Sequence, residues 1–247
     1  VAPNAILFTN GDNDTFPLWY LQDVEGVRQD VRIANLSLLN TPWYIKQLKH
    51  NTPHGAEKVP MTLTDEEIDR IGPQRWEPRV LSLDVPDSLI SEFNVTDSLI
   101  LATKKLNWLM ENTVQFGDIK ALRTQDIVSL NIILANQWKR PIYFAVTTPD
   151  DSKLGLDDYL RMEGFAFRLV PEPRSESFYY VEPNILKEQL FNEPEGYSKD
   201  YQPGFKFRGL SDPTIFFDEN HTRLSSNYRN SFIRLALHYL EGQDYSY

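Results

Sequence analysis

The sequence predicts an α/β fold: a three-layer, Rossmann-like sheet of mostly parallel strands, followed by a separate helical segment at the C-terminal end. Three observations lead to this fold class. Residues 5–40 read as strand, polar loop, helix and strand, which is a βαβ unit. A second helix-then-strand step occupies residues 125–147 and extends the same sheet. With 247 residues, 41% of them hydrophobic, the chain can bury a sizeable core.

The first βαβ unit begins with the apolar run Ala5–Phe8, which is too short for a helix and is bounded by turn residues. Residues 9–15 then concentrate amides, hydroxyls and carboxylates where the chain leaves this strand. Thr15 is predicted to be the N-cap of a helix over residues 16–24. The run 31–35 is the next buried strand, and its pairing with the first is expected to be parallel.

The middle of the chain contains two short helices with clear start signals. Thr41 and Pro42 begin a helix that runs to His50. Thr64 and Glu67 match a capping box, which predicts a short helix ending at Ile71. Residues 76–95 read as extended segments with turns at prolines, and residues 98–112 are compatible with strand, helix or both.

The second half repeats the alternation of helix and strand. Thr124 is expected to cap a helix over residues 125–137, which precedes the buried strand 142–147. Residues 159–170 are predicted to turn at Gly164 into one more strand. Residues 171–218 are rich in Pro, Asn, Gly and aromatic residues and contain one helix capped by Asn184.

The last segment is an amphipathic helix with an apolar stripe, formed by Phe232, Leu235, Ala236 and Tyr239. Its pattern, with Gly242 and Tyr245 behind it, resembles the first helix and turn of a tetratricopeptide repeat. The alternative is an ordinary C-terminal helix packed on the domain. We therefore expect two parts, an α/β domain over residues 1–226 and a truncated repeat helix over residues 227–247.

Composition excludes several classes of function. The net charge of −10 and the pI of about 4.9 argue against a surface for nucleic acid or anionic lipid. The chain has no Cys, which excludes disulfides, thiolate metal sites and cysteine nucleophiles. It has no signal-peptide pattern and begins without Met, directly before a core strand, so we expect an excised piece of a longer protein.

Five stretches of the chain resemble one family of large, multi-spanning membrane proteins of Gram-negative bacteria that carry a domain of unknown function. That family is similar to the protein O-mannosyltransferase-like glycosyltransferases of the GT-C type. The stretches are residues 4–20, 30–40, 138–145, 158–171 and 223–235.

The resemblance implies a role outside the membrane. The chain would be the region that follows the last span, on the periplasmic side of the bacterial inner membrane and ahead of tetratricopeptide-like repeats. Its partners would be the membrane-spanning part of the same chain, those repeats and an acceptor polypeptide or glycan, but no nucleic acid. The family assigns transferase chemistry to the membrane bundle, so the resemblance implies an accessory domain that is not catalytic by itself.

The candidate ligand site lies in the polar loop, because ligands in open α/β sheets bind outside the carboxyl ends of the strands. Carboxylate and amide oxygens suit Ca²⁺ or Mg²⁺ and also bind sugar hydroxyls. No cofactor is expected, although a divalent cation on Asp12 and Asp14 is possible. The alternative is a structural turn whose carboxylates favour the N-terminus of the helix. The candidate residues are Asn10, Asp12, Asn13, Asp14 and Thr15 in the loop, with Trp19 and Trp43 as an aromatic platform.

A second hypothesis is a metal-dependent enzyme that acts on a carbohydrate or phosphate ester through Asp12 and Asp14. It requires further carboxylates at the same edge, and the only candidates are Asp150 and Asp151. The four histidines are scattered, with no spacing that indicates a metal site or catalytic triad.

Two pairs of charged residues beside the predicted strands 142–147 and 159–170 are expected to have structural roles and not to form a functional site. Arg161 and Glu163 are expected to form an internal salt bridge, and Lys139-Arg140 a solvated turn.

Overall fold

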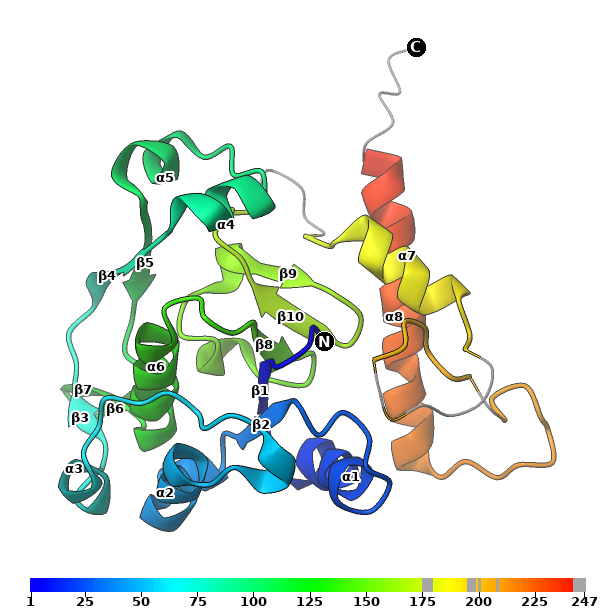
Figure 1. Ribbon diagram of the computed structural model, residues 1–247, viewed down its shortest axis with the longest axis horizontal. Coiled ribbons are helices and arrows are strands. Elements are labelled where there is room, and N and C mark those ends of the chain that lie inside the picture. The colour runs from blue at the N-terminus through cyan, green and yellow to red at the C-terminus, as the bar shows by residue number, and fades with distance from the viewer. Residues whose placement is uncertain (175–179, 195–198, 200, 208, 242–247) are drawn as a thin grey trace.

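The structure, a computed structural model, is an α/β fold in which helices flank a central sheet (Figure 1). It describes residues 1–174, 180–194, 199, 201–207 and 209–241. The strands are β1 (Ile6–Thr9), β2 (Arg32–Asn35), β3 (Gln74–Arg75), β4 (Arg79–Asp84), β5 (Lys105–Met110), β6 (Val114–Phe116), β7 (Ile119–Leu122), β8 (Ile142–Ala145), β9 (Leu160–Met162) and β10 (Ala166–Leu169). The α-helices are α1 (Asp12–Asp23), α2 (Pro42–His50), α3 (Asp65–Asp69), α4 (Asp87–Glu92), α5 (Ser98–Thr103), α6 (Thr124–Asn136), α7 (Pro183–Phe191) and α8 (Glu219–Glu241). Short 3₁₀ turns are η1 (Leu38–Asn40), η2 (Pro53–Gly55), η3 (Asp150–Ser152) and η4 (Asp157–Tyr159).

The central sheet has the strand order β2-β1-β8-β10-β9. The β1 strand pairs in parallel with β2 and β8, whereas β10 is antiparallel to both β8 and β9. The expected mostly parallel, Rossmann-like sheet is therefore not confirmed, and the sheet is mixed. The reason is the predicted turn at Gly164, whose φ of +77° closes a β9–β10 hairpin that returns beside β8.

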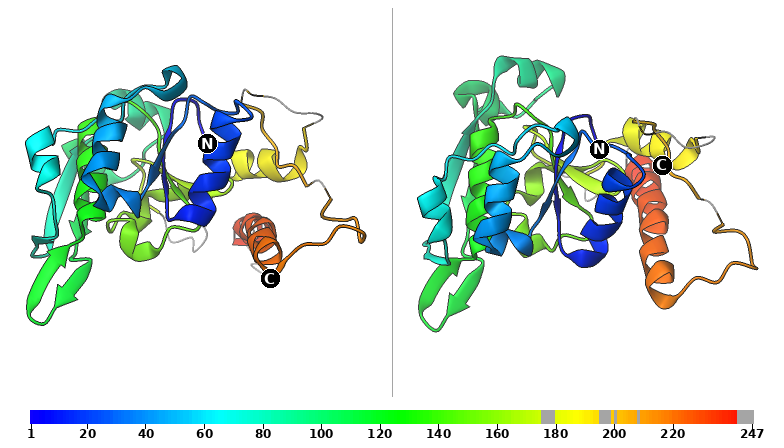
Figure 2. Two further views of the ribbon diagram at one scale, coloured as in Figure 1. Left: turned by 90° about the horizontal axis from the view of Figure 1, so that it is seen from below. Right: turned by 60° about the horizontal axis from the view of Figure 1, so that its bottom comes forward.

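The two faces of this sheet carry different cores. Ile6 and Phe8 point to the face where buried residues of α2 and α6 pack. Ala5 and Leu7 point to the other face, where Leu18 of α1 packs. Figures 1 and 2 show α7 and α8 on this second side, beyond α1. The sheet is thus covered by helices on both sides.

The segment between α3 and α6 forms an outer layer of small sheets. β4 pairs with β5 in a two-stranded ribbon, and β7 lies between β3 and β6. The undecided stretch 98–112 is both helix and strand, as α5 and β5. The prediction that residues 76–95 are extended is confirmed for β4 and is wrong for α4, which is a helix. Figure 2 shows the β6–β7 hairpin standing out from the rest of the molecule.

Several predicted helix starts are wrong by a few residues. α1 begins at Asp12 with Gly11 as N-cap, so Thr15 is a buried residue of its second turn and not the cap. The cap of α6 is Arg123 in place of Thr124. The cap of α7 is Glu182, and Asn184 lies within its first turn. The hydroxyl of Thr15 instead bonds the side chains of Thr9 and Asn35, which are tertiary partners and not part of the helix.

Other start and stop signals are confirmed. Helix α2 runs from Pro42 to His50 as predicted, although Thr41 bonds the carbonyl of Leu38 and makes no side-chain cap. Thr64 and Glu67 form the predicted capping box, and α3 ends at Asp69, two residues before the expected end.

The C-terminal helix packs against α7. Leu235 of α8 is buried with Leu186 and Leu190 of α7. Because α8 starts at Glu219, the predicted boundary between residues 226 and 227 falls inside one continuous helix. Gly242 and Tyr245 of the repeat-like pattern lie outside the described residues. The tetratricopeptide-like assignment stays a prediction.

Candidate functional site

Buried polar side chains meet at the carboxyl ends of β1 and β2. The hydroxyls of Thr9 and Thr15 are 2.7 Å apart, and the amide of Asn35 donates to Thr15 Oγ1 at 2.9 Å. Asn35 Oδ1 also accepts from the backbone N–H of Leu38 at 3.0 Å. Thr9, Thr15 and Asn35 are all 0% exposed, so this network fixes the start of α1 against the sheet.

Asp14, the neighbour of Thr15 in α1, links the loop after β1 to the segment after the third parallel strand. Its Oδ2 accepts from the backbone N–H of Asn10 at 3.2 Å and from the hydroxyl of Thr147, which follows β8. Asp12 and Asn13 are exposed. Residues two apart on a helix do not face each other, so the carboxylates of Asp12 and Asp14 point to different sides. That geometry does not favour one cation held by both.

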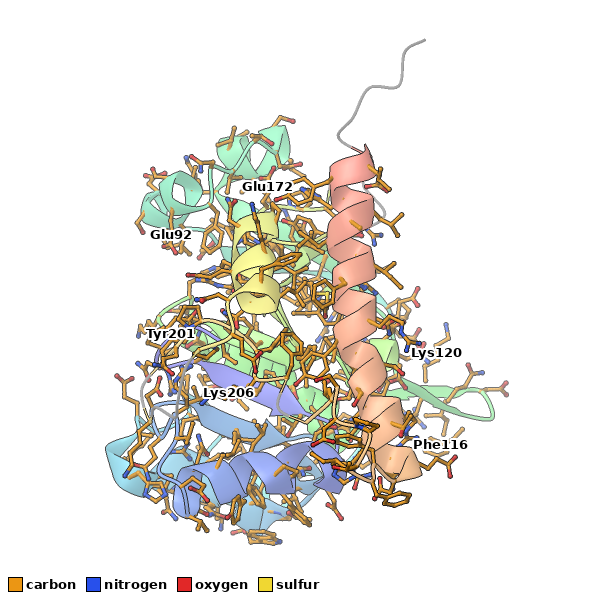
Figure 3. All side chains as sticks on the ribbon, turned by 90° about the vertical axis from the view of Figure 1, so that its right-hand side faces the viewer. Glu92, Phe116, Lys120, Glu172, Tyr201 and Lys206 are labelled. Carbon is orange, nitrogen blue, oxygen red and sulfur yellow. The ribbon has the colours of Figure 1, made fainter. Side chains whose placement is uncertain are left out.

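Asp14 faces a cavity of about 520 Å³ between the second face of the sheet, α1 and α8. Figure 3 looks onto this side, where α8 runs beside α7. The apolar wall includes Leu18, Phe165, Phe205, Leu210, Phe217 and Leu224. The polar wall comprises Thr9, Asp14, Thr147, Glu163, Lys206, His221, Ser225 and Asn227. A large apolar cavity with a few convergent polar groups is the usual form of a ligand site.

Glu163 is the second carboxylate on the cavity wall and is 5% exposed. It accepts from the hydroxyl of Tyr143 at 2.6 Å and from Arg161 at 3.3 Å. Burial, together with the charge of Glu163, raises the pKa of Tyr143. The predicted salt bridge between Arg161 and Glu163 is confirmed, so this carboxylate serves the fold.

The two tryptophans lie elsewhere, in a groove of about 260 Å³ between α1, α2 and β2. Trp19 of α1 and Trp43 of α2 both contact the ring of Tyr44, at centroid distances of 6.4 and 5.6 Å. Neither tryptophan lines the cavity at Asp14. The residues expected to form one site therefore divide between two: Asp14 in the cavity and the tryptophans in the groove.

Asp150 and Asp151 do not join the loop carboxylates. Asp150 pairs with Lys153, and Asp151 pairs with Arg123 at 3.0 Å. Within the described part of the chain, no three His, Asp or Glu side chains form a group suited to a metal ion. Three histidines nonetheless contact carboxylates, a pairing that the sequence spacing did not indicate. The pairs are His50–Asp65, His54–Asp23 and His221–Asp218.

Comparison with known families gives one match. The family model described as TMEM260-associated domain 2 matches residues 1–75 and 82–185, more than half of the chain. The chain belongs to this family. The family is tied to a membrane protein family. No curated protein and no solved structure matches the chain.

Among the described helices, none has both the length and the apolar character needed to cross a membrane.

Sequence reasoning missed two side chains at the site near Asp14, namely Thr147 and Asn35. Each is the last residue of a predicted buried strand. A polar residue at the carboxyl end of such a strand indicates a candidate ligand site. Asn35 is 0% exposed, which confirms the predicted burial of the strand over residues 31–35.

Replacing Asn35 by alanine is expected to lower the free energy of unfolding by about 1–3 kcal/mol, because Thr15 and the N–H of Leu38 lose a buried partner. Urea unfolding would measure this change. Asn13→Ala, at an exposed position of the same loop, is the matched control and should stay within about 0.5 kcal/mol. Equal effects of the two variants would mean that the buried network contributes no stability.

Proposed function

We propose that this chain is an extramembranous accessory domain of a membrane-embedded, glycosyltransferase-like protein. It is not catalytic by itself, and it positions an acceptor polypeptide or glycan for the membrane part of the protein. In the bacterial cell it lies on the periplasmic side of the inner membrane, with tetratricopeptide-like repeats behind it. Membership of a family associated with a membrane protein supports this role.

The observation that carries the proposal is the cavity at Asp14. Its walls combine aromatic and aliphatic side chains with the carboxylate of Asp14 at one corner. A carboxylate accepts hydrogen bonds from hydroxyl and amide groups, which both a polypeptide and a glycan present. Aromatic walls add large apolar contact area at a low cost in side-chain entropy. The cavity therefore suits an acceptor segment with one apolar group and one hydrogen-bond donor.

Thermal unfolding of the chain with candidate acceptors tests the proposal. The probes are short peptides that contain Ser or Thr and one aromatic residue, and a panel of oligosaccharides. A ligand that binds only the folded state adds about 2.7 kcal/mol at a hundredfold excess over its Kd. We expect this stabilisation to disappear in Asp14→Ala and to persist in Asp12→Ala. The latter is the matched control, because both carboxylates lie in the first turn of α1 but only Asp14 lines the cavity. Stabilisation by none of the probes would contradict an acceptor site in this cavity.

The same experiment distinguishes the accessory role from the alternative function, which is a metal-dependent enzyme that acts on a carbohydrate or phosphate ester. The alternative function requires stabilisation by Mg²⁺, Ca²⁺ or Mn²⁺ that is lost in both Asp12→Ala and Asp14→Ala. The helical geometry of this pair favours the accessory role over the enzyme.

A further inference from the structure

We propose that the groove between α1, α2 and β2 is a saccharide-binding site, separate from the cavity at Asp14, that takes one neutral sugar ring against Trp43. This inference does not depend on what the cavity holds. It rests on an exposed indole, a fixed aromatic cluster beneath it and a polar rim beside it.

Of the five tryptophans, all of which the structure describes, Trp43 alone is exposed. Its surface is 59% exposed although it belongs to a helix whose other large residues, Tyr44, Ile45 and Leu48, are buried. An exposed indole leaves a flat apolar surface in water, and the C–H face of a pyranose ring is the complementary surface of a sugar. Trp19, half-buried on the facing helix α1, closes the other side of the groove.

Tyr44, whose ring contacts that of Trp43, is fixed by two hydrogen bonds. The hydroxyl of Tyr44 accepts from the backbone N–H of Asn35 at 3.0 Å and lies 3.1 Å from the carbonyl of Ile33, to which it donates. Burial raises the pKa of Tyr44 to about 12, so it stays a neutral donor. The ring of Trp43 meets that of Tyr44 nearly edge-on, with planes 71° apart. A preorganised platform loses little conformational entropy when a ligand binds.

The rim supplies the groups that bind hydroxyls. Asp23 accepts from His54 Nε2 at 2.7 Å through Oδ1, while its side chain is 64% exposed. Gln47 lies on the same rim and is exposed. His54 has a φ of +54°, a left-handed conformation that is costly for a residue other than glycine. The turn η2 holds its imidazole beside the carboxylate despite that cost.

Size and charge select among ligands. A groove of about 260 Å³ is smaller than the range of about 300–1,000 Å³ typical of drug-sized ligands, so it suits a single ring. Arg32 lines the groove but is 4% exposed, and its Nη1 donates to the carbonyls of Asn51 and Glu57, at 2.6 and 3.1 Å. The exposed charge that remains is the carboxylate of Asp23, which disfavours phosphorylated or acidic ligands. A neutral sugar satisfies both constraints.

Saturation-transfer NMR of the whole chain with methyl mannoside, methyl glucoside, methyl galactoside and N-acetylglucosamine tests this site. We expect at least one of them to bind with a millimolar Kd and to transfer signal from its ring C–H protons. Trp43→Ala should weaken binding at least tenfold, which corresponds to about 1.4 kcal/mol. His54→Gly, which removes the imidazole but accepts the positive φ, should weaken it as well.

Two controls make the result specific. Phe116→Ala removes an aromatic side chain of similar exposure, 63%, from the β6–β7 hairpin and should leave binding unchanged. Trp43→Ala should weaken binding by the same factor in an Asp14→Ala background, which separates this site from the acceptor cavity. The proposal is overturned if no sugar binds at tens of millimolar, if Trp43→Ala binds as tightly as the unaltered chain, or if Phe116→Ala weakens binding equally. It is also overturned if aromatic peptides bind in this groove and the sugars do not displace them.

Discussion

Phe144→Ala is expected to lower the free energy of unfolding by about 3–5 kcal/mol, the largest effect of any single substitution considered for this chain. Phe144 is 0% exposed and lies on β8, between β1 and β10. Its ring stacks on Phe8 of the neighbouring strand, with centroids 4.9 Å apart. Removal of the ring leaves a cavity between this face of the sheet and the helices that pack on it, and the hydrogen-bonded strands cannot shift to fill that space. Chemical denaturation monitored by circular dichroism measures the loss.

Phe116→Ala is the matched control for this prediction, since it removes the same ring from an exposed position. Its effect should stay within about 0.5 kcal/mol. A loss below about 1 kcal/mol for Phe144→Ala would show that the strands around β8 relax to fill the space, and would contradict the rigid core described above.

Asp126→Ala is expected to cost about 2–4 kcal/mol, the second large effect. The carboxylate of Asp126 is 0% exposed and accepts from Arg123 Nε at 2.8 Å and from the hydroxyl of Thr113. It therefore joins the start of α6 to the loop before β6. The side chain of Arg123 is 26% exposed, so water compensates part of the lost interaction and the expected cost lies below that of a fully buried pair.

Asp151→Ala tests whether burial of the carboxylate causes the large loss of stability expected for Asp126→Ala. Asp151 also pairs with Arg123, at 3.0 Å, but its side chain is 56% exposed. An exposed pair contributes about 0–1 kcal/mol, so this variant should unfold at nearly the same urea concentration as the unaltered chain. If the two variants lost the same stability, the position of the carboxylate would not matter and the argument from burial would be wrong.

The candidate site was partly predictable. The loop after the first strand was identified as polar and placed at the carboxyl end of β1, and Asp14 does line a cavity there. The same loop was also read as a helix start with favourable carboxylates, and Asp12 and Asp14 do lie in the first turn of α1. The prediction that Asp14 and Trp19 belong to one site was wrong, because Trp19 lies on another side of the same helix from Asp14. Helical periodicity separates side chains that are close in sequence.

Arg140 shows a second kind of feature that the local sequence could not predict. Beside Lys139 it was expected to lie in a solvated turn, yet it is 4% exposed and donates to the carbonyls of Asn4 at 2.7 Å and Lys58 at 3.1 Å. Those carbonyls belong to segments that are 136 and 82 residues away in sequence. Local composition around Arg140 carries no information about them.

By itself, the sequence determined the elements whose signals are local: the apolar strands β1, β2 and β8, the helices α2 and α6, and the capping box at Thr64. Hydrophobic runs, helical periodicity and capping act between residues that are neighbours in the chain. Only the tertiary structure decided the antiparallel placement of β10 beside β8, the burial of Thr15 and the separation of the acceptor cavity from the aromatic groove. These features depend on which distant segments pack together, because the free energy of burial and of buried hydrogen bonds is set by partners that no local pattern specifies.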